Sequence, residues 1–522
     1  MLSCALLNTV REVIGMADVP IIELKNVRKA FFGVQALDGM NLTINKGEMR
    51  SLIGENGCGK STMIKIISGF YELDEGELWI NGKSFRKIAP IDAMREGIQV
   101  IYQDFSLFPN LTVAENICMS KFIESDKKMI DWKETRRQAE EQLAQLNIQL
   151  DSSTLVSQIS VAEKQIVAIC RALMQDCKLI IMDEPTTALT RKEVEALYVI
   201  VADLMKRGIS VLFVSHKLDE VETVSTKVTV MRNGKNVFEG DTCDLSKEKM
   251  VYYMTGREIR QERYLAETKS DTPVLQVKNL SNGIDFYNVD FDLYGGEVMG
   301  ITGLMGSGRS EIAQALFGLI PYTGQIHIKG QAVSIGSVED AIAKGIAYVP
   351  EDRGSEGLHM TCSIGDNSIV CVLDQLINRI GIVDGKRKDE RMVEILSGLT
   401  IAGMHYEKEV RLLSGGNQQK VLLVKWLGTN PDILILNCPT VGVDVGSKSD
   451  IHEVIRGIAR SGMAVIVISD DIPEIVQVCN RVMIVRDGYI TGELDIRETS
   501  VDDLEELLVD DGQRKVAGGY GQ

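Results

Sequence analysis

The sequence contains little that would place the chain in a membrane or in an oxidising compartment. No apolar run approaches the roughly 18 residues that a membrane-spanning helix needs. The opening residues, 1–7, lack the basic region of a signal peptide, and Met16 is an alternative start. The ten cysteines form no C-x-x-C pair and the five histidines are scattered. Neither a disulfide framework nor a zinc site is predicted, and we expect a soluble protein in a reducing cytoplasm.

Basic residues are also scarce relative to acidic ones. The 57 lysines and arginines face 74 aspartates and glutamates, which gives a net charge of −17. Because nucleic-acid backbones are bound by clustered basic side chains, we expect no nucleic-acid partner.

The sequence does contain a glycine-rich loop between a strand and a helix. Residues 54–62 match G-x-x-x-x-G-K-[ST]; a buried strand is predicted over 49–53 and a helix over 63–69. Backbone N–H groups of such a loop surround phosphate oxygens, and the helix N-terminus adds partial positive charge. We expect Lys60 to bind the β- and γ-phosphates and Ser61 to hold Mg²⁺. The predicted nucleotide-binding residues here are Gly54, Glu55, Asn56, Gly57, Cys58, Gly59, Lys60, Ser61 and Thr62.

Cys58 occupies a loop position that requires only a small residue. One interpretation is that it stands in for alanine. The other is that the helix N-terminus lowers the pKa of its thiol and makes it easy to alkylate.

The chain is a tandem repeat with a long period. Gly-Lys-Ser at 59–61 recurs as Gly-Arg-Ser at 308–310, an offset of 249 (308 − 59). The strand that ends at Asp183 recurs as one that ends at Asn437, an offset of 254 (437 − 183). Charge is dense and apolar residues are few in the segment between the copies, which predicts a solvated linker. The predicted organisation is a tail at 1–20, a first domain at 21–256, a linker at 257–272, a second domain at 273–510 and a tail at 511–522.

Each copy alternates continuous apolar strands with helical patterns. Such strands are typical of a mainly parallel sheet that helices cover on both faces. The early strands at 21–24 and 78–80 favour an antiparallel, hairpin-linked arrangement. We therefore expect two α/β domains of the P-loop NTPase class.

Polar side chains follow several of the predicted strands in the first copy. Asp183 and Glu184 end an apolar strand, which suits a metal-bound phosphate: Asp183 would hold Mg²⁺ through water and Glu184 would orient or deprotonate the attacking water. His216 follows the next strand, at the carboxyl end of a parallel sheet where catalytic groups gather. Gln103, after a strand predicted over 98–102, is a candidate for sensing the γ-phosphate and Mg²⁺. The alternatives are a helix-capping Asp183, a surface His216 and an ordinary polar residue at Gln103.

A second anion-binding helix start is predicted in the second copy. Ser414, Gly415 and Gly416 precede a helix and expose backbone N–H groups. The corresponding residues of the first copy, 160–163, are Ser-Val-Ala-Glu, with a carboxylate where an anion would lie.

Together these motifs resemble the ATP-binding subunits of ABC transporters over about residues 21–510. They are the P-loop, the LSGGN-Q signature at 413–418, MDEPT at 182–186 and Ser-His at 215–216. Two such domains in one chain, with GLMGSGRS at 303–310 and PEDR at 350–353, are similar to importers of ribose, galactose or xylose. The fold implied is a mainly parallel sheet with an antiparallel and a helical subdomain in each domain.

The resemblance also implies a head-to-tail arrangement in which each ATP lies between one P-loop and the other domain's signature. Site one would then combine the first-copy residues with Ser414, Gly415, Gly416 and Gln418, and Phe31 would stack on adenine. Phe32, or a core role for Phe31, remains an alternative. Site two has Arg309, Glu351, Asn437, Cys438 and Asp470 at the matching positions, so we expect no hydrolysis there.

The implied activity is ATP hydrolysis with Mg²⁺ that drives sugar import. The partners would be integral membrane permease subunits and an extracytoplasmic sugar-binding protein, with the chain peripheral on the cytoplasmic side of the cell membrane. A permease contact is predicted near 105–109, where ordinary loop packing is the alternative. Two rival functions are a soluble tandem ATPase acting on ribosomes or nucleic acid, and a nucleotide-sensing regulator.

Overall fold

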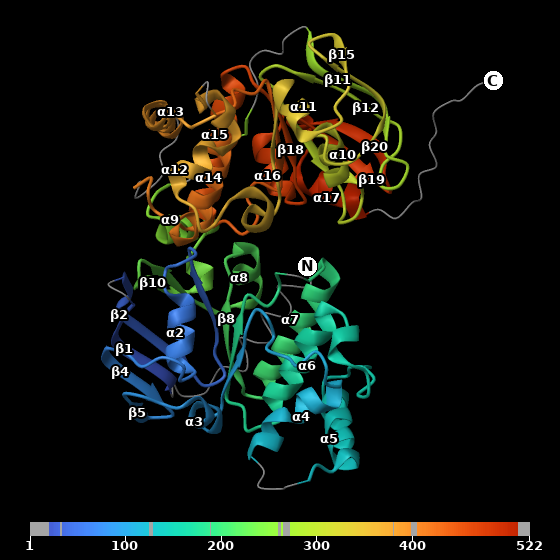
Figure 1. The fold of residues 1–522 in the computed structure, drawn as a ribbon. Helices are drawn as coiled ribbons and strands as arrows, with labels where there is room; N and C mark the ends of the chain where they lie inside the picture. The colour runs from blue at the N-terminus through green and yellow to red at the C-terminus, as the bar shows by residue number, and fades with distance from the viewer. Residues whose placement is uncertain are drawn as a thin grey trace, which may run out of the picture. The chain divides into compact units, whose positions relative to one another are not determined.

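The computed structural model describes residues 20–31, 34–124, 129–187, 189–258, 263–264, 272–378, 381–397 and 405–509. The chain divides into two compact units, Met1–Ile259 and Arg260–Gln522 (Figure 1). Both predicted tails lie almost wholly outside the described residues. None of the helices in the described segments has the length and apolar character needed to cross a bilayer.

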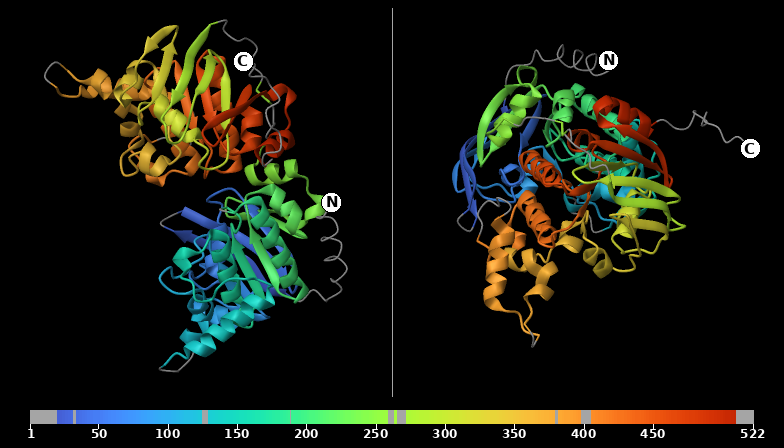
Figure 2. Two further views of the ribbon diagram at one scale, coloured as in Figure 1. Left: turned by 90° about the vertical axis from the view of Figure 1, so that its right-hand side faces the viewer. Right: turned by 90° about the horizontal axis from the view of Figure 1, so that it is seen from above.

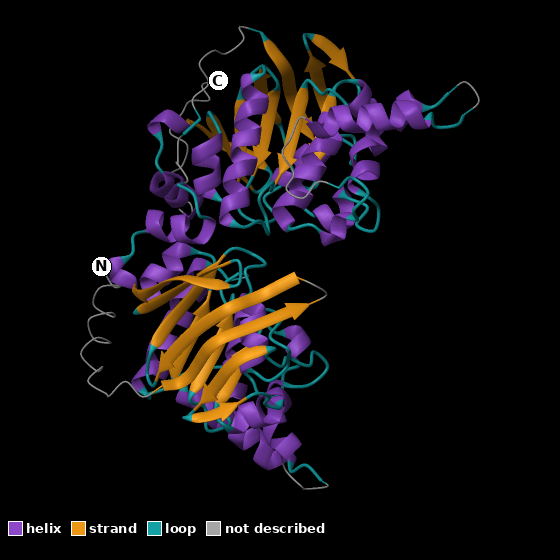
Figure 3. Cartoon of the chain, turned by 90° about the vertical axis from the view of Figure 1, so that its left-hand side faces the viewer, coloured by secondary structure: helices purple, strands orange, loops and turns teal. Residues whose placement is uncertain are grey.

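The described part of unit 1 contains two sheets, whose strands are coloured orange in Figure 3. The antiparallel sheet has the order β2-β1-β4-β5, and the six-stranded sheet has the order β10-β9-β3-β8-β7-β6, parallel except for β10. The strands are β1 Pro20–Phe31, β2 Val34–Asn45, β3 Met49–Gly54, β4 Glu75–Ile80, β5 Lys83–Phe85, β6 Ile98–Ile101, β7 Leu179–Asp183, β8 Ser210–Val214, β9 Lys227–Arg232 and β10 Lys235–Asp241. The helices are α2 Lys60–Ile67, α3 Pro90–Arg95, α4 Val113–Glu124, α5 Trp132–Gln145, α6 Val161–Leu173, α7 Arg191–Lys206, α8 Leu218–Val224 and α9 Lys247–Thr255.

The central strands of unit 1 are apolar throughout because both faces of the sheet are covered. On β7, Ile180 and Met182 pack into the core formed with α4, α5, α6 and α7. Their neighbours Leu179 and Ile181 pack on the opposite face, against α2 and the antiparallel sheet. Side chains alternate across a strand, so a continuous apolar run supplies both cores. Figure 2 gives two further views of these layers.

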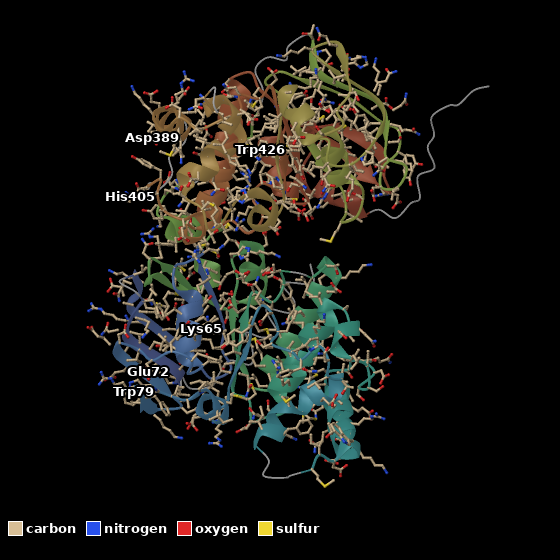
Figure 4. All side chains as sticks on the ribbon, viewed as in Figure 1. Lys65, Glu72, Trp79, Asp389, His405 and Trp426 are labelled. Carbon is tan, nitrogen blue, oxygen red and sulfur yellow. The ribbon has the colours of Figure 1, made fainter. Side chains whose placement is uncertain are left out.

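Unit 2 repeats this topology. Its sheets have the orders β12-β11-β14-β15 and β16-β17-β18-β13-β19-β20. The strands are β11 Pro273–Ser281, β12 Val289–Tyr294, β13 Val298–Thr302, β14 Thr323–Ile328, β15 Gln331–Val333, β16 Ile346–Val349, β17 Ile433–Asn437, β18 Ala464–Ile468, β19 Arg481–Arg486 and β20 Tyr489–Asp495. The helices are α10 Arg309–Leu316, α11 Val338–Ala343, α12 Ile364–Ile369, α13 Gly385–Ser397, α14 Gly415–Leu427, α15 Val445–Arg460, α16 Ile472–Val478 and α17 Val501–Val509. Trp426 of α14, labelled in Figure 4, packs edge-on against Phe317.

The predicted solvated linker needs one correction. Tyr264 is buried in unit 2: its N–H donates to the Gln477 carbonyl at 3.0 Å and its hydroxyl donates to the Gly296 carbonyl at 3.3 Å. An aromatic side chain gains free energy by burial even within a charged segment, so this residue anchors the segment to unit 2. Residues 259–262 and 265–271 of the predicted linker lie outside the described part.

Candidate nucleotide-binding and hydrolysis site

The predicted site residues of unit 1 gather at one edge of its six-stranded sheet. Strands β3, β8, β7 and β6 are successive parallel neighbours. Their carboxyl ends lead into the P-loop, His216, the Asp183–Glu184 pair and Gln103, respectively. Because the carboxyl ends of parallel strands meet at one edge of a sheet, residues 43 (103 − 60) to 156 (216 − 60) positions after Lys60 are brought to one place. This edge is the candidate site.

The P-loop owes its shape to glycines that other residues could not replace. Gly59 has φ +109°, and a Cβ on it would lie 2.5 Å from the Ala36 carbonyl oxygen. A Cβ on Gly54 would lie 2.4 Å from the Met231 carbonyl oxygen. These positions therefore require glycine, which lets the backbone approach a phosphate closely. Lys60 is 7% exposed, and its Nζ donates to the Gly54 and Glu55 carbonyls at 2.6 and 3.0 Å. An incoming phosphate would take the place of these two acceptors.

Glu184 and His216 form a hydrogen-bonded pair. Oε1 of Glu184 lies 2.9 Å from Nδ1 of His216. Glu184 has φ +49°, and its N–H donates to the Val214 carbonyl of the neighbouring strand at 2.9 Å, which fixes the turn after β7. The hydrogen bond from His216, together with nearby positive charges, lowers the pKa of Glu184. The carboxylate is therefore ionised at neutral pH, as a water-orienting base must be.

Asp183 fits a magnesium ligand. Burial and the adjacent Glu184 carboxylate raise its pKa. A carboxylate whose charged form is disfavoured in this way gains from a nearby cation. Ser61, another of the predicted ligands, has an exposed side chain at the start of α2. Asp183 and Ser61 are oxygen ligands of the kind that would hold a Mg²⁺ ion.

Gln103 and Phe31 lie at less constrained places. Gln103 is exposed in the turn after β6, which ends at Ile101 rather than at the predicted residue 102. Phe31 ends β1 half-buried, with its ring centroid 5.0 Å from that of Tyr71. The alternative, Phe32, lies outside the described residues.

Sequence reasoning missed Glu220, which joins the turns that carry the predicted catalytic residues Glu184 and His216. Its carboxylate accepts a hydrogen bond from Thr186 at 2.5 Å and another from Ser215 at 2.8 Å. These hydroxyls flank Glu184 and His216, so Glu220 holds the two turns in register. The repeat offered a sequence signal for this residue, because Glu220 recurs as Glu474 at the 254-residue offset (474 − 220). In unit 2 the carboxylate of Glu474 accepts hydrogen bonds from Ser469 and Thr440 in the same way.

The two signature segments differ in how their helices begin. Glu163 and Ser160 form a capping box at α6: the Glu163 N–H donates to Ser160 Oγ at 3.3 Å, and the Ser160 N–H donates to Glu163 at 2.8 Å. At α14, Ser414 caps no N–H with its side chain. A carboxylate thus already neutralises the first helix terminus, whereas the second remains available for an external anion.

Gln418 supports the second signature from inside unit 2. Only 9% exposed, it donates to the Leu413 carbonyl at 3.1 Å and accepts from Arg353 Nε at 3.1 Å. Arg353 also donates to the Val441 carbonyl at 2.7 Å. These contacts hold the loop that carries Ser414, and a contact between Gln418 and nucleotide stays a prediction.

The interpretation of Cys58 as an activated thiol is wrong. The side chain is 5% exposed, and burial raises the pKa of its thiol in spite of the adjacent Lys60. Desolvation outweighs the helix terminus, so Cys58 behaves as a small packing residue.

The corresponding edge of unit 2 has other side chains where unit 1 has its predicted catalytic residues. Cys438 takes the place of Glu184 with the same turn geometry, φ +48°, and burial raises the pKa of its thiol to about 12. A neutral thiol there cannot act as a base towards water.

Comparison with known proteins identifies the family. The ABC transporter family model matches residues 37–187 and 286–441. This chain belongs to the ABC transporter ATP-binding family. It is 38% identical, over 94% of its length and 98% of the relative's, to "Ribose import ATP-binding protein RbsA" of Clostridium perfringens (strain SM101 / Type A). It is 40% identical, over 92% and 93% of the two lengths, to the "Putative ribose/galactose/methyl galactoside import ATP-binding protein" of Hahella chejuensis (strain KCTC 2396). A solved structure of an ATP-binding cassette of an ABC transporter in its ADP conformation, MJ1267, aligns with 45% of this chain and 94% of its own, at 28% identity and a TM-score of 0.39.

Proposed function

We propose that the chain hydrolyses ATP at one site, built on the first P-loop, and so energises uptake of a ribose-like monosaccharide through a separate permease. The observation that carries the ATPase assignment is the Glu184–His216 pair at 2.9 Å on the same sheet edge as Lys60. The import assignment is supported by the names of relatives that match more than nine-tenths of the chain.

In this proposal each residue has a defined task. Lys60 leaves its two carbonyl acceptors to bind the β- and γ-phosphates, and Phe31 stacks on the adenine. Glu184, held ionised by His216, orients the attacking water and takes up its proton. Ser61, Asp183 and Gln103 would hold Mg²⁺, whose positive charge would offset the negative charge of the phosphates. Ser414, Gly415 and Gly416 of unit 2 would offer backbone N–H groups at the start of α14 to a phosphate.

The proposed partners are membrane permease subunits and an extracytoplasmic sugar-binding protein, with the chain peripheral on the cytoplasmic side. Phe108 is 51% exposed in the segment predicted to contact the permease, whereas Phe105 and Leu107 pack on the core of unit 1. Arg171 holds that turn by donating to the carbonyls of Phe105 and Ser106 at 2.9 and 2.7 Å. Phe108 is therefore the side chain that we expect to enter a permease groove.

Uptake measurements in the native cells test the proposal. Uptake of radiolabelled ribose, galactose and xylose is measured separately in wild-type cells and in cells with the Lys60→Ala variant. The substitution should abolish uptake of one of the three sugars and leave uptake of the other two unchanged. A tagged wild-type chain should co-purify with a membrane protein. Unchanged uptake of all three sugars would overturn the import assignment. The rival functions, a ribosome- or nucleic-acid-directed ATPase and a non-hydrolysing regulator, are disfavoured by the names of the relatives and by the paired Glu184 and His216, respectively.

A further inference from the structure

The second P-loop, in unit 2, keeps the shape of the first. Gly306 and Gly308 have φ +77° and +96°, close to the +80° and +109° of Gly57 and Gly59. A Cβ on Gly308 would lie 2.3 Å from the Asp285 carbonyl oxygen, so glycine is required there as it is at Gly59. The backbone N–H groups that would surround a phosphate are therefore arranged alike in both units.

A cation also occupies the same place under the second loop. Arg309 is 6% exposed, and its Nη1 donates to the Gly303 carbonyl at 2.7 Å, as Lys60 donates to the Gly54 carbonyl. Its Nη2 lies 3.5 Å from a carboxylate oxygen of the half-exposed Asp470. The hydroxyl of Ser307, a residue only 6% exposed, has no hydrogen-bond partner among the described residues. The loop thus retains donors and charge for an anion.

The place of the metal is filled differently. Asn437 replaces Asp183, and its amide oxygen accepts a hydrogen bond from the Ser310 hydroxyl at 3.4 Å. Its amide nitrogen donates to the Tyr348 hydroxyl at 3.2 Å. Tyr348 lies on β16 at the place where unit 1 has Val100 on β6. Unit 2 therefore has both a tyrosine in place of this valine and an asparagine in place of Asp183. In either orientation of the amide the cluster of Ser310, Asn437 and Tyr348 is neutral and internally bonded.

A neutral cluster of this kind does not suit Mg²⁺, which prefers carboxylate ligands and gives up its waters reluctantly. Cys438, next in the chain, adds no oxygen ligand, and Glu351 contributes a single exposed carboxylate at the position of Gln103. Unit 2 therefore keeps the loop that would surround an anion. At the position of the metal ligand it has instead a group of side chains that bond to one another.

We propose that the second P-loop binds a nucleoside di- or triphosphate as the free anion, without magnesium. The proposal rests on the proposed function only in taking the bound anion to be a nucleotide. Arg309 takes over the charge compensation that the metal would give, because a guanidinium offers several donors to phosphate oxygens. Nucleotide held in this way is retained without turnover, because a neutral thiol, that of Cys438, stands where unit 1 has Glu184.

Nucleotide and metal counts on the full-length chain test this proposal. In a Glu184→Gln background, which prevents turnover, equilibrium dialysis with radiolabelled ATP should give two nucleotides per chain in Mg²⁺. In EDTA one nucleotide should remain, with its Kd changed less than about twofold. Replacing Arg309 with alanine should remove the EDTA-resistant nucleotide, and replacing Lys60 with alanine should remove the magnesium-dependent one. Arg309→Lys, with the melting temperature measured for both Arg309 variants, controls for misfolding and should retain binding.

A paramagnetic metal gives a second, independent readout. With Mn²⁺ in place of Mg²⁺ and saturating ATP, electron paramagnetic resonance should count one bound Mn²⁺ per chain. Asn437→Asp should raise this count to two. Loss of all nucleotide in EDTA, its survival in Arg309→Ala, or two Mn²⁺ in the parent chain would overturn the proposal. If Lys60→Ala instead left the magnesium-dependent nucleotide in place, the proposed function would fail while the Arg309 result still decided the present proposal.

Discussion

Oε1 of Glu184 and Nδ1 of His216 lie 2.9 Å apart, although the two residues are on turns after different strands. The backbone N–H of Glu184 bonds to the carbonyl of Val214, two residues before His216, at 2.9 Å. The contact between the side chains is thus built on a contact between the turns, and both depend on β7 and β8 being parallel neighbours.

Replacing Glu184 with glutamine should reduce ATP turnover by roughly 10²–10⁴-fold, because an amide cannot take up a proton from water. Steady-state phosphate release by the purified chain measures this. The double change Asn437→Asp and Cys438→Glu is the matched control in unit 2 and should alter turnover little. A Glu184→Gln protein that keeps near-normal turnover would refute the assignment of the base.

Removing His216 should change the pH dependence of turnover. The His216 hydrogen bond is the largest cause of the lowered pKa of Glu184, which lies below its usual 4.5. A base with a lowered pKa stays ionised until the pH falls through that value, so protonation of Glu184 should not limit turnover above about pH 5. In His216→Ala the pKa should rise and the acidic limb of the rate profile should move to higher pH. An unmoved limb would show that the hydrogen bond does not act on Glu184 during turnover.

Glu220 and Glu474 offer a matched test of positioning. Each carboxylate joins a Ser and a Thr on two turns, at 2.8 and 2.5 Å in unit 1 and at 2.6 and 2.8 Å in unit 2. Either Glu→Gln change should cost stability on the order of 1 kcal/mol, measured by urea unfolding. Only Glu220→Gln should lower kcat, by about tenfold, with KM for ATP unchanged. Equal loss of kcat in both variants would point to a general structural role.

Ser160 and Ser414 begin corresponding helices and should respond oppositely to alanine. Ser160→Ala breaks a capping box and should cost about 1 kcal/mol with little effect on turnover. Ser414 caps no helix N–H, so Ser414→Ala should leave the melting temperature unchanged and lower turnover. Thermal unfolding and phosphate release are measured on both variants. Full ATPase activity in Ser414→Ala would show that this serine takes no part in hydrolysis.

Thiol labelling tests the burial of Cys58. Burial raises the pKa of its thiol, and the thiolate is the reacting form. Brief maleimide treatment at pH 7 should label Cys243 and Cys362, which are exposed, well before Cys58. Peptide mass spectrometry reads out each position, and labelling of Cys58 at the rate of Cys243 would contradict the structure.

Much of the fold could be predicted because local patterns repeat in sequence. The continuous apolar runs at 179–182 and 211–214 indicated buried parallel strands, and the structure places them as β7 and β8. The P-loop could be recognised in the sequence because the backbone geometry requires glycine at several positions within one short segment. The burial of Tyr264 could not be predicted in this way, because the linker was assigned from its average composition, whereas burial depends on the tertiary surface that a side chain meets.

The sequence by itself determined the family, the tandem repeat and the types of residue available for phosphate and metal, because these depend on chemistry and short-range order. Only the tertiary structure decided which polar atoms are engaged with one another. The link that Glu220 makes between the turns of Glu184 and His216, and the closed cluster of Ser310, Asn437 and Tyr348, join residues from separate strands. Hydrogen bonds depend on distances of a few tenths of an ångström, and those distances are set by strand pairing and packing over the whole unit.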